Sequence, residues 1–191
     1  MSERADRFTV VLDANVLATG LGRNMLLSLA EAGLFRPRWT ADILDETEGA
    51  IRKIIKDPEK AKTQRQRIDE AFPEACINGH EIFVDGLKLK DPDDRHVVAA
   101  AIRTRAAIIV TENLKDFDPE VLEALDIQCL SLDDFVADLI DLAGPEAIEA
   151  LRVMRKRFKN PETTAEALIR RIEAKGYVQT ASLLERFASL L

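Results

Sequence analysis

Four acidic residues in this chain have the type and placement that a metal site would need. Asp13 follows the apolar stretch Phe8–Leu12, Glu46 and Asp94 lie in two separate helical patterns, and Asp116 follows a second apolar stretch. Grouped carboxylates repel one another and are costly to bury unless a cation pairs with them. Oxygen ligands without a neighbouring His or Cys pair favour Mg²⁺ or Mn²⁺ over Zn²⁺. The acids therefore predict a site for one of these two ions.

Asp94 carries the clearest physical argument. A helix over residues 93–105 buries Val97, Val98 and Ala101, and at 100° per residue Asp94 points along the middle of that apolar face. Helix capping explains an acid at Asp91 or Asp93, but not one on the buried side. His96 is expected to point the opposite way, toward solvent. The pattern therefore favours a functional role for Asp94.

The remaining acids have ordinary structural alternatives. Asp13 could be a helix N-cap or an Asx-turn residue, with Asn15 placed to orient its carboxylate. Asp116 lies in a loop after a strand, where acids are common, although polar groups at Thr111 and Asn113 end the same strand. Glu46 and Glu48 both flank the apolar stripe of their helix, and periodicity does not choose between them. Each of these acids therefore needs support from elsewhere in the chain.

The elements that must position these acids alternate between strand and helix. Strand patterns cover 8–12, 34–39, 81–84, 107–111 and 127–130, and helical patterns cover 16–32, 41–56, 58–71, 93–105, 119–125 and 132–142. Such alternation predicts an α/β fold with a parallel sheet and helices on both faces. In these folds the ligand site lies beyond the carboxyl ends of the strands, where Asp13 and Asp116 fall.

A break at Gly144-Pro145 precedes three further helical segments, at about 146–158, 162–174 and 179–190. Asn160-Pro161 has the residue types of an N-cap and first helical position for the second of these segments. The sequence therefore predicts a main domain at 1–143 and a helical extension at 144–191. The last segment has an apolar stripe made of Val178, Leu183, Leu184, Phe187 and Leu190. This stripe could fold back on the domain or meet a partner helix, and folding back is the favoured interpretation.

Composition narrows the function further. The net charge of −7 over 191 residues argues against a simple nucleic-acid-binding domain. Residues 145–191 nevertheless hold nine Lys/Arg against six Asp/Glu, and residues 52–67 hold seven basic groups against two acids. The charged N-terminus does not read as a secretory signal and no stretch reaches the roughly 18 apolar residues of a membrane span, so a cytoplasmic protein is expected. Cys76 and Cys129 read as reduced thiols.

Four segments together resemble PIN-domain ribonucleases, especially VapC-like toxins of type II toxin–antitoxin systems. The matching segments, in order, are Val11–Val16, Ile43–Glu46, Asp91–Ala101 and Val110–Phe117. The resemblance implies a PIN-like three-layer α/β/α catalytic domain over 1–143 and a subgroup whose members carry a C-terminal helical extension. It carries the catalytic and metal-binding roles onto Asp13, Glu46, Asp94 and Asp116, choosing Glu46 over Glu48. Asn15, Thr111 and Asn113 match supporting positions.

The implied chemistry is hydrolysis of RNA phosphodiester bonds with one or two Mg²⁺ or Mn²⁺ ions. Cations near the site are expected to hold the RNA backbone: Arg52, Lys53, Lys56, Lys60 and Arg65, together with Arg152, Arg155, Lys156 and Arg157. The resemblance also implies a small antitoxin partner encoded alongside and a homodimer.

Three alternatives remain. A PIN-fold module could bind RNA or a protein without cutting, although a degenerate acid set would be expected in such a module. A haloacid-dehalogenase-like phosphatase would need a second Asp where Asn15 stands. A phosphoacceptor receiver domain would need an acidic pair at the end of the first strand, which the chain lacks.

Overall fold

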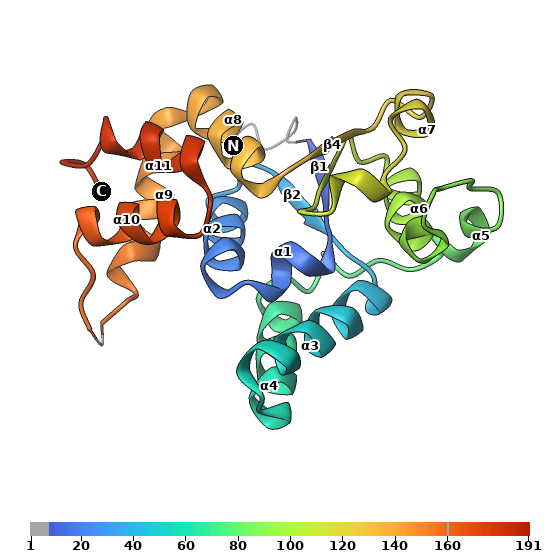
Figure 1. Ribbon diagram of the computed structural model, residues 1–191, viewed down its shortest axis with the longest axis horizontal. Coiled ribbons are helices and arrows are strands. Elements are labelled where there is room, and N and C mark those ends of the chain that lie inside the picture. The colour runs from blue at the N-terminus through green and yellow to red at the C-terminus, as the bar shows by residue number, and fades with distance from the viewer. Residues whose placement is uncertain (1–7, 160) are drawn as a thin grey trace, which may run out of the picture. The chain divides into compact units, whose positions relative to one another are not determined.

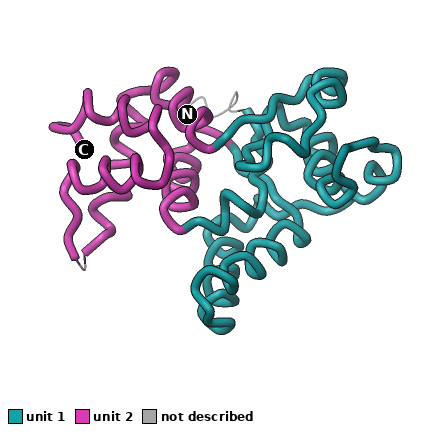
Figure 2. Tube along the Cα trace, in the orientation of Figure 1, with its two compact units in different colours: residues 1–19, 36–131 teal, residues 20–35, 132–191 magenta. Residues whose placement is uncertain are grey.

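The computed structural model describes residues 8–159 and 161–191, so the charged N-terminal stretch lies outside the described part (Figure 1). Packing divides the chain into two compact units (Figure 2). Unit 1 takes residues 36–131 and the chain up to Thr19, and unit 2 combines residues 20–35 with residues 132–191. A helix from the first fifth of the chain therefore packs with the C-terminal helices. The division of function between 1–143 and 144–191 remains a prediction.

Unit 1 is built on a parallel sheet of four strands. The strands are β1 (Thr9–Leu12), β2 (Arg36–Arg38), β3 (Ile108–Val110) and β4 (Gln128–Leu130), in the spatial order β2-β1-β3-β4. The last residues of three strands are in register, with Leu12 beside Val110 and Val110 beside Leu130. Residues that follow β1 and β3 therefore start from neighbouring points on one edge of the sheet.

Helices alternate with these strands along unit 1, which confirms the predicted α/β class with a central parallel sheet. They are α1 (Ala14–Ala18), α3 (Ala41–Ile55), α4 (Pro58–Ala71), α5 (Glu81–Val84), α6 (Arg95–Thr104) and α7 (Pro119–Glu123). The inward side chains of α6, Val97, Val98 and Ala101, are fully buried, and α6 packs against β1 and β3. Their burial removes apolar surface from water, at roughly 25 cal/mol per Å².

The α3 helix, which carries Glu46, is held by an N-cap at one end and by side-chain packing toward the other. Thr40 is its N-cap, with the Oγ1 atom accepting a hydrogen bond from the Ile43 backbone N–H at 3.2 Å. Ile51 packs with Ala18 and Ala61 in a small buried cluster. Alanine at both of these positions leaves room for α3 to lie close to α1 and α4.

Unit 2 contains α2 (Gly20–Glu31), α8 (Leu132–Leu142), α9 (Gly144–Lys156), α10 (Ala165–Ala174) and α11 (Val178–Glu185). Asp133 on α8 accepts hydrogen bonds from the Gln179 and Thr180 backbone N–H groups at 2.9 and 2.8 Å, which satisfies the start of α11. Leu184 of the terminal stripe is fully buried, so this part of the stripe folds back within unit 2. Val178 and Leu190 stay 58% and 60% exposed.

Three local predictions are wrong. Residues 81–84 form the short helix α5, which packs on α6 and pairs with no strand. The predicted helix over 16–32 is divided, because Thr19 takes an extended conformation between α1 and α2. The α10 helix begins at Ala165 and not at about residue 162. Thr164 caps it by accepting from the Ala167 N–H at 3.2 Å, and Asn160, the predicted N-cap, lies outside the described residues.

Among the described residues, no helix combines the length and apolarity needed to cross a bilayer.

Candidate metal centre

Asp13 lies where β1 ends and α1 begins, at the edge of the sheet. Its backbone N–H donates to the Val110 carbonyl at 3.1 Å, which joins it to β3, and its Oδ1 atom accepts from the Ala14 N–H at 2.6 Å. The residue is 5% exposed. The predicted N-cap role of Asp13 is therefore observed, and it leaves Oδ2 for other partners.

Thr111 and Asn15 hold the second oxygen of Asp13. The Thr111 hydroxyl donates to Asp13 Oδ2 at 2.6 Å and the Asn15 Nδ2 group donates to the same atom at 2.7 Å. Thr111 Oγ1 in turn accepts from Asn15 Nδ2 at 2.8 Å and from the Asn113 N–H at 3.0 Å. A hydroxyl has one donor and two acceptor sites, so Thr111 is fully satisfied. This buried network fixes the orientation of the Asp13 carboxylate.

Asp94, Asp116 and Asp91 form a group in which each residue offers one carboxylate oxygen within 4.8 Å of the others. Asp94 ends a 3₁₀ turn at Pro92–Asp94 and precedes α6, and Asp116 ends a 3₁₀ turn at Leu114–Asp116. The Asn113 side-chain amide donates to Asp116, so Asn113 is brought to the acid as expected. Three half-buried carboxylates thus face one another.

Asp91 is the member of this group that the sequence did not single out. Its Oδ1 atom caps the 3₁₀ turn by accepting from the Asp93 N–H at 3.0 Å, as the capping interpretation expected. Asp91 nevertheless belongs to the three-acid group with Asp94 and Asp116. The run Asp91-Pro-Asp-Asp was the signal for it, but capping explained Asp91 fully at the level of sequence.

The electrostatics of the group indicate uncompensated negative charge. Burial, followed by the charges of Asp13, Asp91 and Asp116, raises the pKa of Asp94 from 3.8 to about 6. Burial also raises the pKa of Asp13, although its hydrogen bonds from Thr111 and Ala14 act in the opposite direction. A carboxylate whose neighbours are carboxylates is stabilised when a cation enters between them. The arrangement can therefore bind a divalent ion.

Glu46 reaches this region beside His96 rather than within the three-acid group. The Nε2 atom of His96 lies 3.3 Å from Glu46 Oε1, and the His96 side chain is 13% exposed. The prediction that His96 points to solvent is therefore wrong, because side chains of α3 lie beside the helix face that α6 alone would expose. Burial lowers the pKa of His96, but the hydrogen bond that His96 donates to Glu46 and the charges of Glu46, Asp42 and Asp13 outweigh it and raise the pKa overall.

Two of the predicted RNA-binding cations are engaged within unit 1. Arg65 donates through Nε and Nη2 to Asp45 Oδ1 at 3.2 and 2.9 Å, and its Nε lies 3.9 Å from Glu48. Lys60 pairs with Asp57 at 3.2 Å. The exposed cations Arg52, Lys53 and Lys56 lie at the C-terminal end of α3, on the helix that carries Glu46. At 1.5 Å per residue they stand about 9–15 Å beyond Glu46 along the axis.

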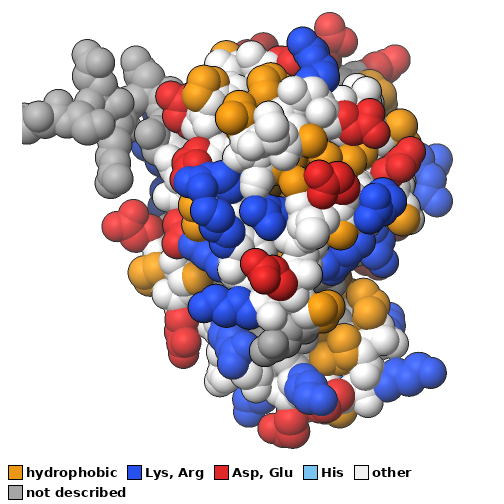
Figure 3. Space-filling model, turned by 90° about the vertical axis from the view of Figure 1, so that its left-hand side faces the viewer, with side chains coloured by type: hydrophobic (Ala, Val, Ile, Leu, Met, Phe, Trp, Pro, Cys, Tyr) orange, Lys and Arg blue, Asp and Glu red, His pale blue; other side chains and the backbone are white. Residues whose placement is uncertain are grey.

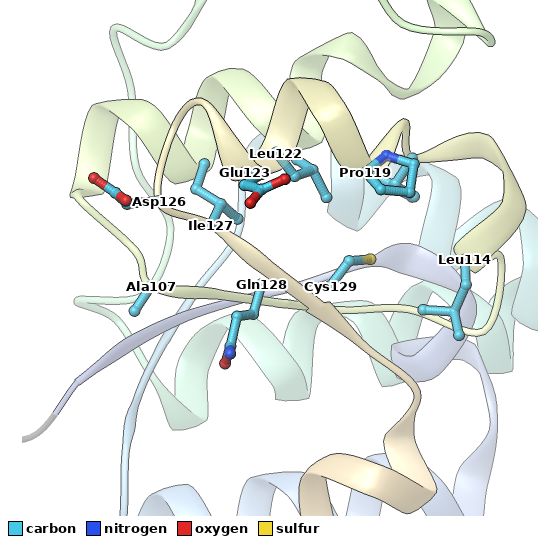
Figure 4. Close-up of a pocket in the computed structure, with 10 residues that line it drawn as sticks. Ala107, Leu114, Pro119, Leu122, Glu123, Asp126, Ile127, Gln128 and Cys129 are labelled. Carbon is cyan, nitrogen blue, oxygen red and sulfur yellow. The ribbon is translucent and has the colours of Figure 1, made fainter.

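A separate cavity of about 640 Å³ lies between α7 and β4, and it contains none of the predicted acids (Figure 4). Its walls are mostly apolar, with Leu114, Leu122 and Ile127 labelled in the close-up. The thiol of Cys129 also lines it, and burial, with the charges of Asp13 and Asp94, raises its pKa to about 12. A thiol that stays protonated is a poor nucleophile, so Cys129 is not expected to act as one in this cavity.

The fold is that of a known family. Residues 9–115 match the PIN domain family, and the chain belongs to it. Residues 132–186 match a second family described as the VapC50 C-terminal domain. These matches confirm the resemblance drawn from the sequence, including the C-terminal extension. No solved structure matches the chain.

A curated relative makes the comparison more particular. The chain is 40% identical over 76 residues to a protein of Mycobacterium tuberculosis named "Putative ribonuclease VapC50". The match covers 40% of this chain and 45% of that relative, so the two are compared over less than half of their lengths.

Proposed function

We propose that this protein is a Mg²⁺- or Mn²⁺-dependent endoribonuclease that hydrolyses RNA phosphodiester bonds. The observation that carries the proposal is the convergence of Asp91, Asp94 and Asp116 within 4.8 Å, in a PIN domain whose Asp13 lies close enough to raise the pKa of Asp94. The relative named as a ribonuclease supports the same activity. Catalysis is assigned to Asp13, Glu46, Asp94 and Asp116.

The donor set fits the proposed ion. Every member of the three-acid group is a carboxylate, and hard oxygen ligands suit Mg²⁺ or Mn²⁺. A divalent cation bound here would stabilise negative charge on the phosphate and make a neighbouring water more acidic. Asp91, Asp94 and Asp116 would hold the cation, and we propose that the site binds one or two ions.

Asp13 and Glu46 are proposed to contribute through where their carboxylates are held. Asp13 is fixed by Thr111, Asn15 and the Ala14 N–H, so its carboxylate needs no reorganisation when substrate arrives. Glu46, 52% exposed and paired with His96, can accept a proton from an attacking water or orient it. This assignment gives Glu46 a role distinct from that of the four aspartates.

RNA is proposed to approach along α3. The exposed Arg52, Lys53 and Lys56 offer positive charge beyond Glu46 on the same helix, and they could hold phosphates whose approach the acids alone would oppose by repulsion. Lys60 and Arg65 are proposed to join them, after exchanging Asp57 and Asp45 for phosphate.

The biological role we propose is that of a toxin in a toxin–antitoxin pair, acting in the cytoplasm. It rests on the match to the VapC50 C-terminal domain and on the relative's name. An uninhibited ribonuclease harms its host, so a small antitoxin is the expected protein partner, and a homodimer is the expected assembly. The competing function is a non-catalytic PIN module that binds RNA or protein.

The test is cleavage of a mixed cellular RNA pool by the purified full chain, with Mg²⁺, with Mn²⁺ and with EDTA. Asp94→Asn is the disabling variant, and Asp93→Asn, an exposed neighbour of the same charge, is the matched control. Discrete products that need metal and fall roughly 100-fold in Asp94→Asn, but not in Asp93→Asn, support the nuclease. Calorimetric metal binding without cleavage would favour the binding module.

A further inference from the structure

A second cavity, of about 420 Å³, lies in unit 2 where α9 ends and α10 passes. Its walls combine cationic, aromatic and small residues: Arg157, Phe158, Lys159, Pro161, Thr163 and Arg171. Pockets of roughly 300–1,000 Å³ accommodate small ligands or parts of larger ones. None of these residues belongs to the candidate metal centre.

The walls of this cavity are held in place by side-chain contacts. The Arg155 guanidinium donates to the Thr163 carbonyl at 2.6 Å and to the Leu191 carbonyl at 2.9 Å, which fixes the backbone on one side. The Arg171 guanidinium lies over the Phe158 ring, 5.3 Å from its centroid. An arginine stacked on an aromatic ring keeps its N–H edges available for an anion. The cavity is therefore preorganised for a ligand that is both flat and negatively charged.

The charge around the cavity is positive although the whole chain is acidic. Arg157 uses one N–H group for Glu31, at 2.8 Å, and has further donors. Within the described part of the chain, Lys159 and Arg171 form no ion pair with an acid. Figure 3 shows Lys and Arg side chains gathered near the middle of the face it presents, with Asp and Glu side chains among and around them. An anion placed here meets three cations from two sequence segments.

We propose that this cavity binds the backbone phosphate of single-stranded RNA, with a base stacked at the Phe158–Arg171 pair. The inference rests on the proposed function, since it assigns a substrate contact to the C-terminal extension. Single-stranded RNA combines the two chemistries that the cavity offers, because its phosphates need cations and its unstacked bases pack on aromatic or guanidinium planes. An acidic peptide would use the charges but not the stacked pair.

The experiment is fluorescence anisotropy of a labelled oligouridine of about twelve nucleotides. It uses the full chain carrying Asp94→Asn, in EDTA, so that RNA is bound and not cut. The test variant is Lys159→Ala/Arg171→Ala. The matched control is Arg170→Ala/Lys175→Ala, which removes the same charge from exposed positions of unit 2 that do not line the cavity.

The cavity pair is expected to weaken RNA binding about tenfold and the control pair by less than about twofold. Loss of two phosphate contacts should also reduce the slope of log affinity against log salt by about 1.4. Phe158→Leu should weaken binding several-fold with the slope unchanged, because it removes stacking and no charge. Circular dichroism checks folding, and Arg171→Gln alone replaces the pair if the pair does not fold.

Three outcomes would overturn the inference. Equal losses in the cavity and control pairs would mean that only overall charge matters. Unchanged RNA binding in a folded cavity pair would exclude the site. Loss of binding to a labelled polyglutamate peptide, with RNA binding retained, would assign the cavity to an acidic protein partner. RNA cleavage by the unmodified chain is measured separately. If the chain cleaves RNA but the cavity does not bind it, the nuclease proposal stands and the cavity proposal fails. If the cavity binds RNA but the chain does not cleave it, the cavity proposal stands and the nuclease proposal fails.

Discussion

Replacing Asp94 with Asn should stabilise the metal-free protein while disabling the metal site. In the folded chain burial and the charges of Asp13, Asp91 and Asp116 raise the pKa of Asp94 from 3.8 to about 6. The folded state therefore binds a proton more tightly than the unfolded state, and stability falls as pH rises from about 4 to about 6. Above that range Asp94 is ionised in both states, and the full free-energy cost of holding its charge in the folded protein remains. Asn removes the charge and with it the penalty.

The size of the effect follows from three contributions. A pKa of about 6 in place of 3.8 corresponds to at most about 3 kcal/mol of unfolding free energy. Asp94 is only half-buried, so solvent screening cuts this to about 1–2 kcal/mol. Loss of a negative charge at the start of α6 costs about 0.5 kcal/mol, and no side-chain cap bond is lost. The net gain is about 1 kcal/mol, or about 2–4 °C in Tm for a chain of this length.

The assay is thermal unfolding in EDTA at about pH 4 and about pH 7.5, repeated with increasing Mg²⁺. Asp94→Asn should melt higher than the unmodified chain at the upper pH and equally at the lower pH. Mg²⁺ at 100 times its Kd should stabilise the unmodified chain by about 2.7 kcal/mol and the variant by less. Asp93→Asn should show no gain. A variant that melts lower at pH 7.5, or a difference independent of pH, would refute the reasoning.

Three further substitutions test the surroundings of the site and the packing of α3. Thr111→Val leaves Asp13 without its hydroxyl donor and should cost about 1–3 kcal/mol in urea unfolding, and a loss near zero would contradict the network. His96→Gln should lose more stability at about pH 6 than at about pH 8.5. The reason is that a raised His pKa adds stability below about pH 6.5, and this stability is lost as the pH rises through the folded-state pKa. Equal losses at the two pH values would contradict the pairing of His96 with Glu46. Ala61→Leu should lower the unfolding free energy by about 1–3 kcal/mol through overpacking, and unchanged thermal melting would count against that packing.

The sequence could predict the edge of the sheet because local patterns determine it. Apolar strands before Asp13 and Thr111 indicated two parallel neighbours, and parallel neighbours bring their carboxyl ends together. The same reasoning anticipated that Asn15, Thr111 and Asn113 would gather around the acids, and hydrogen bonds now join each of them to Asp13 or Asp116. Short-range periodicity and strand polarity were sufficient for this part.

Contacts between distant elements could not be predicted in this way. His96 was expected in solvent because the periodicity of α6 says nothing about Glu46 arriving from another helix. Asp91 was explained by capping, and nothing in the local pattern reveals that a capping carboxylate also meets Asp94 and Asp116. The exposed position of Glu46 at the flank of α3 was foreseen, but its partner was not. In each case the missing information was a tertiary contact with an element distant in the sequence.

The discontinuous make-up of unit 2 has a consequence for the newly synthesised chain. The α2 helix packs against α9, whose residues follow about 125 positions later, so the apolar face that includes Met25 and Leu29 has no partner when it first emerges. At 5–20 residues per second this wait lasts roughly 6–25 seconds. Sheet formation in unit 1 also precedes completion of unit 2 in synthesis order. The nascent chain therefore exposes the apolar face of α2 for seconds, and we expect a ribosome-associated chaperone to bind it during that time.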